Sequence, residues 1–343
     1  MDLALYDPEH GFYTSGGVAG RRGDFLTSPE VGPLFGAVVA RAIDTWWSDA
    51  GEPDPFVVVE AGAGPGTLAA AVLHAHPDCT PALRYVLVER SATQRAEHER
   101  RLRVESPAFA FAPDRREDED DAGPADAAVG PIVVSLAELP RVHGTAVVLA
   151  NELLDNLPAD LLEYRGSAWH DVRVGLSDDG QRLVEHLLPS TMAPDIDAAD
   201  GARVPVQSAA AQWVRHAQGF AARVVAFDYA STSADLAARP QPEWLRTYRG
   251  HQRGTEPLDD LGTQDITIEV CVDQLPPPTS DVSQAAFLHA HGVDDLVAEG
   301  RRVWEERKAI GDLEAMTARS RITEAEALTD PAGLGAFRVL EWC

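Results

Sequence analysis

A group of closely spaced glycines with an acidic residue ahead of them could bind a nucleotide-like ligand. The group consists of Glu60, Gly62, Gly64, Gly66 and Thr67. Glycines let a ligand approach bare backbone where a strand turns into a helix. Dinucleotide-binding turns have the spacing G-x-G-x-x-G, whereas the spacing in this chain is G-x-G-x-G. The alternative is a glycine turn that only packs a helix on a sheet.

Three acidic side chains could accept hydrogen bonds from such a ligand. Glu60 ends the first predicted strand, where it could orient the glycine turn or meet an amino group. Glu89 ends the second strand, and its carboxylate could accept from both hydroxyls of a ribose. A surface acid that happens to follow a strand is the alternative for Glu89. Asp24 follows a glycine and could also be an acceptor, although Gly-Asp is otherwise an ordinary turn.

A second polar group, Asn151, Glu152 and Asp155, follows the strand predicted at 146–150. Because the carboxyl ends of parallel strands share one edge of a sheet, these residues should project toward the glycine turn. A carboxylate there can hold a cationic group and take its proton, and Glu152 could pair bidentately with a guanidinium. The alternative is that Asn151 and Asp155 cap the next helix. We expect Glu152 to be the functional residue and Asp155 the more structural one.

Buried strands alternate with helices along the chain, which predicts an α/β fold with a doubly wound, mostly parallel sheet. Strands are expected at 56–60, 85–89, 132–135, 146–150, 223–229, 266–272 and 337–342. Helices are expected from an N-cap at Ser28 through Trp47 and at 68–76, 91–103, 283–296 and 300–316. The acidic run at 115–128 is expected to be a solvated loop. We divide the chain into an N-terminal cap or substrate-side segment at 1–55, a ligand-binding core at 56–164, an inserted antiparallel or loop region at 165–222, and the rest of the core with inserted helices at 223–343.

The composition limits the partners. The chain carries 55 acidic and 29 basic residues, a formal net charge of −26, which counts against binding to nucleic acid. The three cysteines, Cys79, Cys271 and Cys343, are isolated, so neither a zinc site nor a disulfide framework is expected, and the histidines suggest no metal site. Neither a signal peptide nor an apolar run of membrane-spanning length is present in the sequence. These features predict a cytoplasmic protein without a metal or a membrane partner.

Taken together, the motifs resemble the MidA family of S-adenosylmethionine-dependent methyltransferases, whose mitochondrial members are protein arginine methyltransferases needed for respiratory complex I assembly. The resemblance spans nearly the whole chain and rests on blocks at 4–13, 23–30, 60–67, 88–91, 150–158, 228–229, 248–249 and 265–267. Two departures stand out. The chain has Gly62-Ala63-Gly64 where the family usually has Gly-Pro-Gly, and Leu153-Leu154 where it usually has two phenylalanines.

The resemblance implies a Rossmann-like class I methyltransferase fold with S-adenosyl-L-methionine as cofactor. The glycine turn through Thr67, together with Asp24, Glu60 and Glu89, would bind the cofactor. Glu152 and its polar neighbours would orient or deprotonate an arginine side chain of a protein, for example a respiratory complex I subunit. The alternatives are a small-molecule O- or N-methyltransferase and an assembly factor that binds the cofactor without catalysis.

Overall fold

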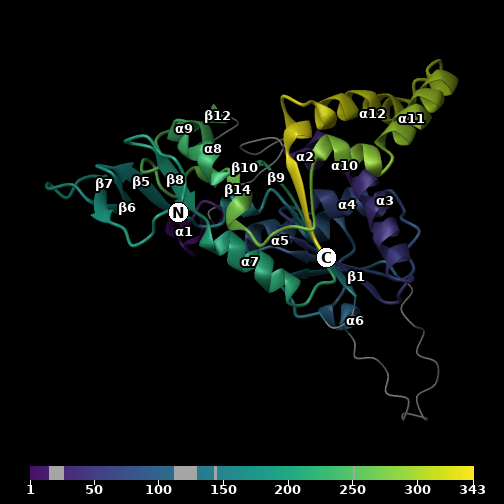
Figure 1. Cartoon of the computed structure of the whole chain (residues 1–343). Helices are drawn as coiled ribbons and strands as arrows, with labels where there is room; N and C mark the ends of the chain where they lie inside the picture. The colour runs from purple at the N-terminus through teal and green to yellow at the C-terminus, as the bar shows by residue number, and fades with distance from the viewer. Residues whose placement is uncertain (15–26, 112–129, 143–144, 250–251) are drawn as a thin grey trace, which may run out of the picture.

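The computed structural model describes residues 1–14, 27–111, 130–142, 145–249 and 252–343. Two predicted features, Asp24 and the acidic run at 115–128, lie outside these residues. A seven-stranded sheet is formed by β1 (Phe56–Ala61), β2 (Leu83–Val88), β3 (Ile132–Leu136), β4 (Ala146–Asn151), β9 (Arg223–Asp228), β15 (Ser280–Ser283) and β16 (Arg338–Trp342). The strand order is β15-β16-β9-β4-β1-β2-β3 (Figure 1).

Five neighbouring strands of this sheet, from β3 to β9, are parallel. Strand β16 runs antiparallel both to β9 and to β15. The order reverses its direction at β1, whose two neighbours are β2 and β4. The predicted α/β fold with a mostly parallel sheet is therefore confirmed.

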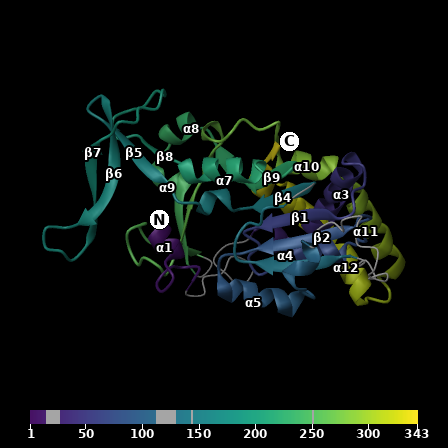
Figure 2. The ribbon, with the colours of Figure 1, turned by 90° about the horizontal axis from the view of Figure 1, so that it is seen from below.

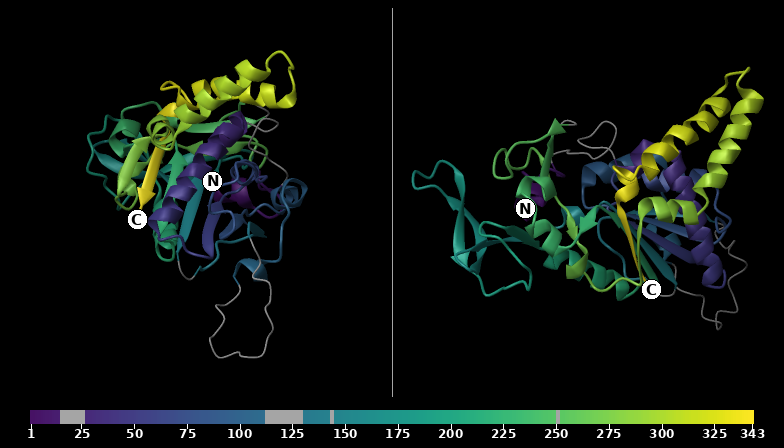
Figure 3. Two further views of the ribbon diagram at one scale, coloured as in Figure 1. Left: turned by 90° about the vertical axis from the view of Figure 1, so that its right-hand side faces the viewer. Right: turned by 45° about the horizontal axis from the view of Figure 1, so that its top comes forward.

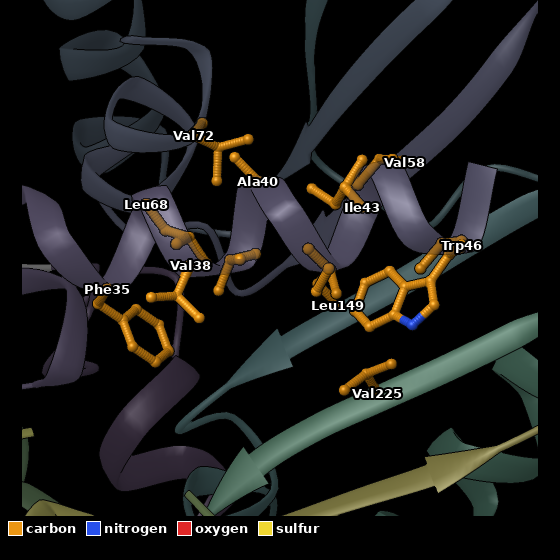
Figure 4. Packing of buried hydrophobic residues seen from close by; sticks show 14 of the residues in the cluster. Phe35, Val38, Ala40, Ile43, Trp46, Val58, Leu68, Val72, Leu149 and Val225 are labelled. Atoms are coloured by element: carbon orange, nitrogen blue, oxygen red, sulfur yellow. The ribbon is translucent and has the colours of Figure 1, made fainter. Parts of the chain in front are cut away.

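Helices cover both faces of the sheet. This arrangement explains why the sequence of β1 is apolar at consecutive positions. Phe56 and Val58 belong to a core that includes helices α3 (Pro33–Asp49) and α4 (Thr67–His74). Val57 and Val59 belong to a second core that includes α7 (Ser208–Gln218). Alternate side chains thus enter opposite layers, as expected for a strand buried on both faces. Figure 4 shows the first core, where α3 packs on side chains of the sheet.

Two inserted parts extend from opposite ends of the central sheet (Figure 2). One is an antiparallel sheet made of β5 (Asp160–Arg165), β6 (Ala168–Leu176), β7 (Leu183–Pro189) and β8 (Arg203–Val206). The other contains α10 (Gln284–Ala290), α11 (Val293–Arg307) and α12 (Leu313–Thr329), and the last two helices form a hairpin (Figure 3). The antiparallel sheet starts before residue 165, and the division of the chain into four segments stays a prediction.

The bounds predicted for two helices, 283–296 and 300–316, are wrong. Gly292, at φ 84°, separates α10 from α11, and Gly311, at φ 65°, lies between α11 and α12. Glycine readily adopts this left-handed conformation, which ends a helix.

The remaining elements have ten residues or fewer. The helices are α1 (Asp2–Tyr6), α2 (Ser28–Val31), α5 (Ala92–Arg101), α6 (Pro107–Ala110), α8 (Ser233–Ala237), α9 (Gln241–Trp244), η1 (Leu154–Asn156), η2 (Val272–Gln274) and η3 (Leu334–Ala336). The strands are β10 (Ala230–Ser231), β11 (Leu245–Arg249), β12 (Gln252–Arg253), β13 (Asp265–Ile268) and β14 (Val270–Cys271). Within the described part of the chain, no helix has the length and apolar character needed to cross a membrane.

Candidate active site

A cavity of about 630 Å³ lies at the carboxyl ends of β1, β2 and β4. This is the place where the strand order reverses, and ligands of open α/β sheets bind at such points. Most of the predicted site residues line the cavity: Glu60, Gly62, Gly64, Thr67, Glu89, Asn151 and Glu152. The fold therefore brings the glycine turn and the polar group after β4 into one space, while the role of each residue stays a prediction.

The glycine turn needs its glycines for two physical reasons. Gly62, Gly64 and Gly66 have φ values of 67°, 53° and 81°, in the left-handed region that disfavours residues with a Cβ atom. Space is also limited, because a Cβ atom at Gly62 would lie 3.0 Å from Leu153 Cδ1. Gly66 does not line the cavity but is the N-cap residue of α4. The turn thus exposes backbone to the cavity at the start of a helix.

Glu89 joins the end of β2 to this turn. Its Oε2 accepts a 3.0 Å hydrogen bond from the Gly64 N–H, and its Oε1 accepts a 2.8 Å bond from the Ser91 N–H. Burial raises the pKa of Glu89, and these backbone donors oppose that shift. Each carboxylate oxygen has a further lone pair, so Glu89 can still accept from hydroxyl groups in the cavity.

Glu60 forms part of the cavity wall at the end of β1. Its Oε2 accepts a 2.7 Å hydrogen bond from the hydroxyl of Tyr85, a fully buried residue of β2. Burial raises the pKa of Glu60 to about 8, although the Tyr85 bond lowers it. A cationic ligand group beside Glu60 would favour the ionised carboxylate.

Glu152 follows β4 in a strained backbone conformation, with φ at 50°. Its backbone N–H donates to the Phe227 carbonyl at 2.8 Å, which ties this peptide to β9. Its Oε1 accepts from the Ser28 N–H and from Asn151 Nδ2, each at 3.2 Å. Ser28 is not the N-cap that the sequence predicted, because Thr27 is the N-cap of α2. The single helix predicted from Ser28 through Trp47 is also wrong, because Gly32 separates α2 from α3. The first N–H of α2 instead points at the candidate catalytic carboxylate.

Asp155 lies behind the cavity wall, buried, and does not line the cavity. Its Oδ2 accepts a 2.6 Å hydrogen bond from the Tyr229 hydroxyl. The alternative role of Asn151 and Asp155 as helix caps is wrong, because Leu153 is the N-cap of η1 and no side chain caps it there. Instead, Asp228 Oδ2 accepts from the N–H groups of Leu154 and Asp155, at 3.0 and 3.3 Å.

Glu152, Asp155 and Asp228 form an acidic cluster whose members affect one another. Burial is the main cause that raises the pKa of Glu152 to about 8, and the charge of Asp155 adds to it. Burial also raises the pKa of Asp155 to about 6 and that of Asp228 well above its ordinary range. A cation entering the cavity would relieve this repulsion and favour the ionised carboxylates.

Sequence reasoning assigned no role to several residues that contact the site. Tyr6 and Tyr13 line the cavity with stacked rings 5.6 Å apart, and the Tyr13 hydroxyl donates to Asp265 Oδ1 at 2.9 Å. On α5, Gln94 lines the cavity and His98 contacts the glycine turn. The aromatic-rich opening of the chain could have indicated the tyrosines. The spacing of Gln94 and His98 by four positions places them on one helix face, which is the signal for that pair.

The residues that line the cavity have the chemistry needed to bind S-adenosyl-L-methionine. Its glycine turn offers bare backbone in a conformation that other residues disfavour, and Glu89 offers acceptors for ribose hydroxyls. This site and the doubly wound sheet define a class I methyltransferase. The family described as "Putative S-adenosyl-L-methionine-dependent methyltransferase" matches residues 38–291. The chain belongs to this family, and its cofactor is S-adenosyl-L-methionine.

Individual relatives agree with this assignment. The chain is 24% identical over 321 residues to the mitochondrial protein arginine methyltransferase NDUFAF7 of Mus musculus, a match that covers 86% of this chain and 70% of that protein. It is 45% identical over 73 residues to the homologue from Drosophila melanogaster, covering 21% of this chain and 17% of that protein. A COG1565 superfamily member from Burkholderia thailandensis, crystallised with S-adenosyl-homocysteine, is 28% identical with a TM-score of 0.76, covering 99% of this chain and 85% of that one. The methyltransferase family, fold and cofactor implied by the resemblance are thus confirmed.

Proposed function

We propose that the chain transfers a methyl group to a nitrogen of an arginine side chain in a protein. The observation that carries this proposal is the position of Glu152, a carboxylate in the wall of the same cavity as the glycine turn. Asp155 and Asp228 lie buried behind it, so three carboxyl groups gather on this side of the cavity. A guanidinium is planar and always charged when free, and its forked donors match a carboxylate.

Bound S-adenosyl-L-methionine supplies a methyl group on a positively charged sulfur. Glu152 would hold the guanidinium by hydrogen bonds to its oxygens and take the proton that the methylated nitrogen loses. The Ser28 N–H and Asn151 Nδ2 hold Glu152 Oε1, so the carboxyl group is fixed before an acceptor enters. Positioning of this kind is the main contribution that a protein makes to a displacement reaction.

The names of the relatives support a protein acceptor, since the mouse protein is named a protein arginine methyltransferase. A respiratory complex I subunit is the partner that the MidA resemblance suggests, and it is part of the proposal. The cytoplasmic location also stays a prediction, and the mouse relative carries a mitochondrial name. Fractionation of cells that produce the protein tests the location.

Transfer of a labelled methyl group separates this function from its alternatives. The protein is incubated with S-adenosyl-L-methionine labelled in the methyl group and with an extract of methylation-deficient cells. We expect label in the protein fraction and methylarginine after acid hydrolysis. Label only in the low-mass fraction would identify a small-molecule methyltransferase. If the protein binds the cofactor and transfers no label, the non-catalytic assembly factor is the better interpretation.

A further inference from the structure

His98 of α5 is fully buried and uses both ring nitrogens. Its Nε2 lies 2.8 Å from the carbonyl oxygen of Gly64, in the middle of the glycine turn. Its Nδ1 lies 2.8 Å from Ser135 Oγ near the end of β3. The ring therefore connects the glycine turn, which follows β1, to a different strand, β3.

The hydrogen-bonding chemistry assigns the tautomer of this ring. A carbonyl oxygen only accepts, so Nε2 must carry the proton that bonds to Gly64. In a neutral imidazole Nδ1 is then a bare acceptor, and the Ser135 hydroxyl donates to it. Burial lowers the pKa of His98, and the nearby Arg95 and Arg101 lower it further, which favours the neutral ring.

Gly64 is held from both sides by this arrangement. Its N–H donates to Glu89 Oε2 at 3.0 Å, and its carbonyl accepts from His98. The ring also packs against the next glycine, because a Cβ atom at Gly66 would lie 3.2 Å from His98 Cδ2. The peptide groups on both sides of Gly64 are therefore held, one by Glu89 and the other by His98.

We infer that His98 is a positioning residue that holds the glycine turn in the conformation that binds S-adenosyl-L-methionine. Glycines lose more conformational freedom on ordering than other residues, and the turn has three of them at alternate positions. A binding site that is ordered before its ligand arrives does not lose that entropy on binding. His98 itself does not line the cavity, so its effect on the cofactor passes through Gly64.

Two substitutions of His98 separate this role from a general structural one. In H98Q the amide nitrogen takes about the place of Nε2 and can still donate to Gly64. In H98N the amide takes about the place of Nδ1, so it can bond to Ser135 and cannot reach Gly64. The affinity of each variant for S-adenosyl-homocysteine is measured by calorimetric titration, and its unfolding temperature is measured without this ligand.

We expect H98Q to bind S-adenosyl-homocysteine within about threefold of the unmodified protein, and H98N to bind about tenfold more weakly, the effect of losing one buried hydrogen bond. Both variants should unfold at similar temperatures. The inference is overturned if H98N binds as tightly as the unmodified protein, or if both variants weaken equally. Should either variant fail to fold, the ¹⁵N chemical shifts of His98 in the unmodified protein decide. The Nε2–H tautomer supports the inference, and the Nδ1–H tautomer overturns it.

Discussion

Tyr85 and Glu60 lie on neighbouring parallel strands, where Tyr85 pairs in register with Val58, and a hydrogen bond of 2.7 Å runs from the tyrosine hydroxyl to Glu60 Oε2. Tyr85 is fully buried, and Glu60 is only 4% exposed at the wall of the cofactor cavity. A buried carboxyl of this kind needs a partner, because an unsatisfied polar group in the interior is costly. The second strand therefore supports the first at the point where the glycine turn begins.

We expect Y85F to destabilise the protein, because it removes this donor and leaves Glu60 Oε2 without it. The free energy of unfolding should fall by ~1–3 kcal/mol, the usual effect of leaving a buried acceptor unsatisfied. The loss should also raise the pKa of Glu60, since the Tyr85 bond lowers it. Urea denaturation of both proteins measures the change. An unchanged midpoint and slope would show that the hydrogen bond contributes nothing to stability.

The left-handed glycines give a second prediction with a matched control. Gly64 and Gly180 have similar φ values, 53° and 68°, but only Gly64 belongs to the cofactor turn. A Cβ atom at Gly180 meets nothing within 4 Å, and this residue lies in the turn between β6 and β7. Alanine should cost ~1–2 kcal/mol of stability at either position through backbone strain.

Only G64A should also lose cofactor affinity, because strain at Gly64 displaces the N–H that bonds to Glu89. We expect its dissociation constant for S-adenosyl-homocysteine to rise at least about tenfold, while G180A stays within about twofold of the unmodified protein. Calorimetric titration measures both. Equal affinities for the two variants would mean that the conformation of the turn does not control cofactor binding.

The sequence predicted the parts of the site that depend on local pattern. A few neighbouring residues are enough to predict strand ends, turn glycines and the acids that follow strands. Parallel strands then bring their carboxyl ends together. The cavity accordingly contains Glu60, Glu89 and Glu152.

The parts that escaped prediction depend on contacts between distant segments. Ser28 donates to Glu152, 124 positions away, and Tyr13 donates to Asp265, 252 positions away. Asp228 receives the first N–H groups of η1, a role that local pattern assigned to nearer residues. Local helix-capping rules cannot find such partners, because the fold decides which chain segment lies within reach.

The raised pKa values predict how stability depends on pH. Glu60 and Glu152, each with a pKa of about 8, and Asp265, at about 7, keep their protons in the folded state over a range where the unfolded chain has released them. Between pH of about 4 to 4.5, the pKa range of these groups in the unfolded chain, and pH of about 8, the folded state binds more protons than the unfolded state. Stability therefore falls as pH rises through this window.

We expect a higher unfolding temperature at pH 5.5 than at pH 8.5, measured in high salt so that repulsion among surface charges is screened. E60Q removes one of the titrating groups and should make the change with pH smaller. The interpretation is wrong if unfolding temperatures rise across this range, or if E60Q leaves the slope as it is in the unmodified protein.

A substitution of Glu152 separates binding of the cofactor from turnover. E152Q keeps the shape of the side chain and removes its charge, so it should bind S-adenosyl-homocysteine within about twofold of the unmodified protein while its kcat falls at least about 100-fold. Glu163 offers a control, because it is a buried glutamate in β5 that pairs with Arg203 and does not line the cavity. E163Q should keep its turnover even where it lowers stability. Full turnover in E152Q would make Glu152 a structural residue.

The pH profile of the same reaction tests the role of the charge. Glu152 must be ionised to hold a guanidinium, and burial and Asp155 raise its pKa to about 8, so it is mostly protonated in the free enzyme at neutral pH. The value of kcat/KM for the acceptor should therefore rise with pH up to and beyond about 8, since this ratio reports groups of the free enzyme. Residual activity of E152Q should lack that rise. A profile that falls through this range would point to a group that acts in its protonated form.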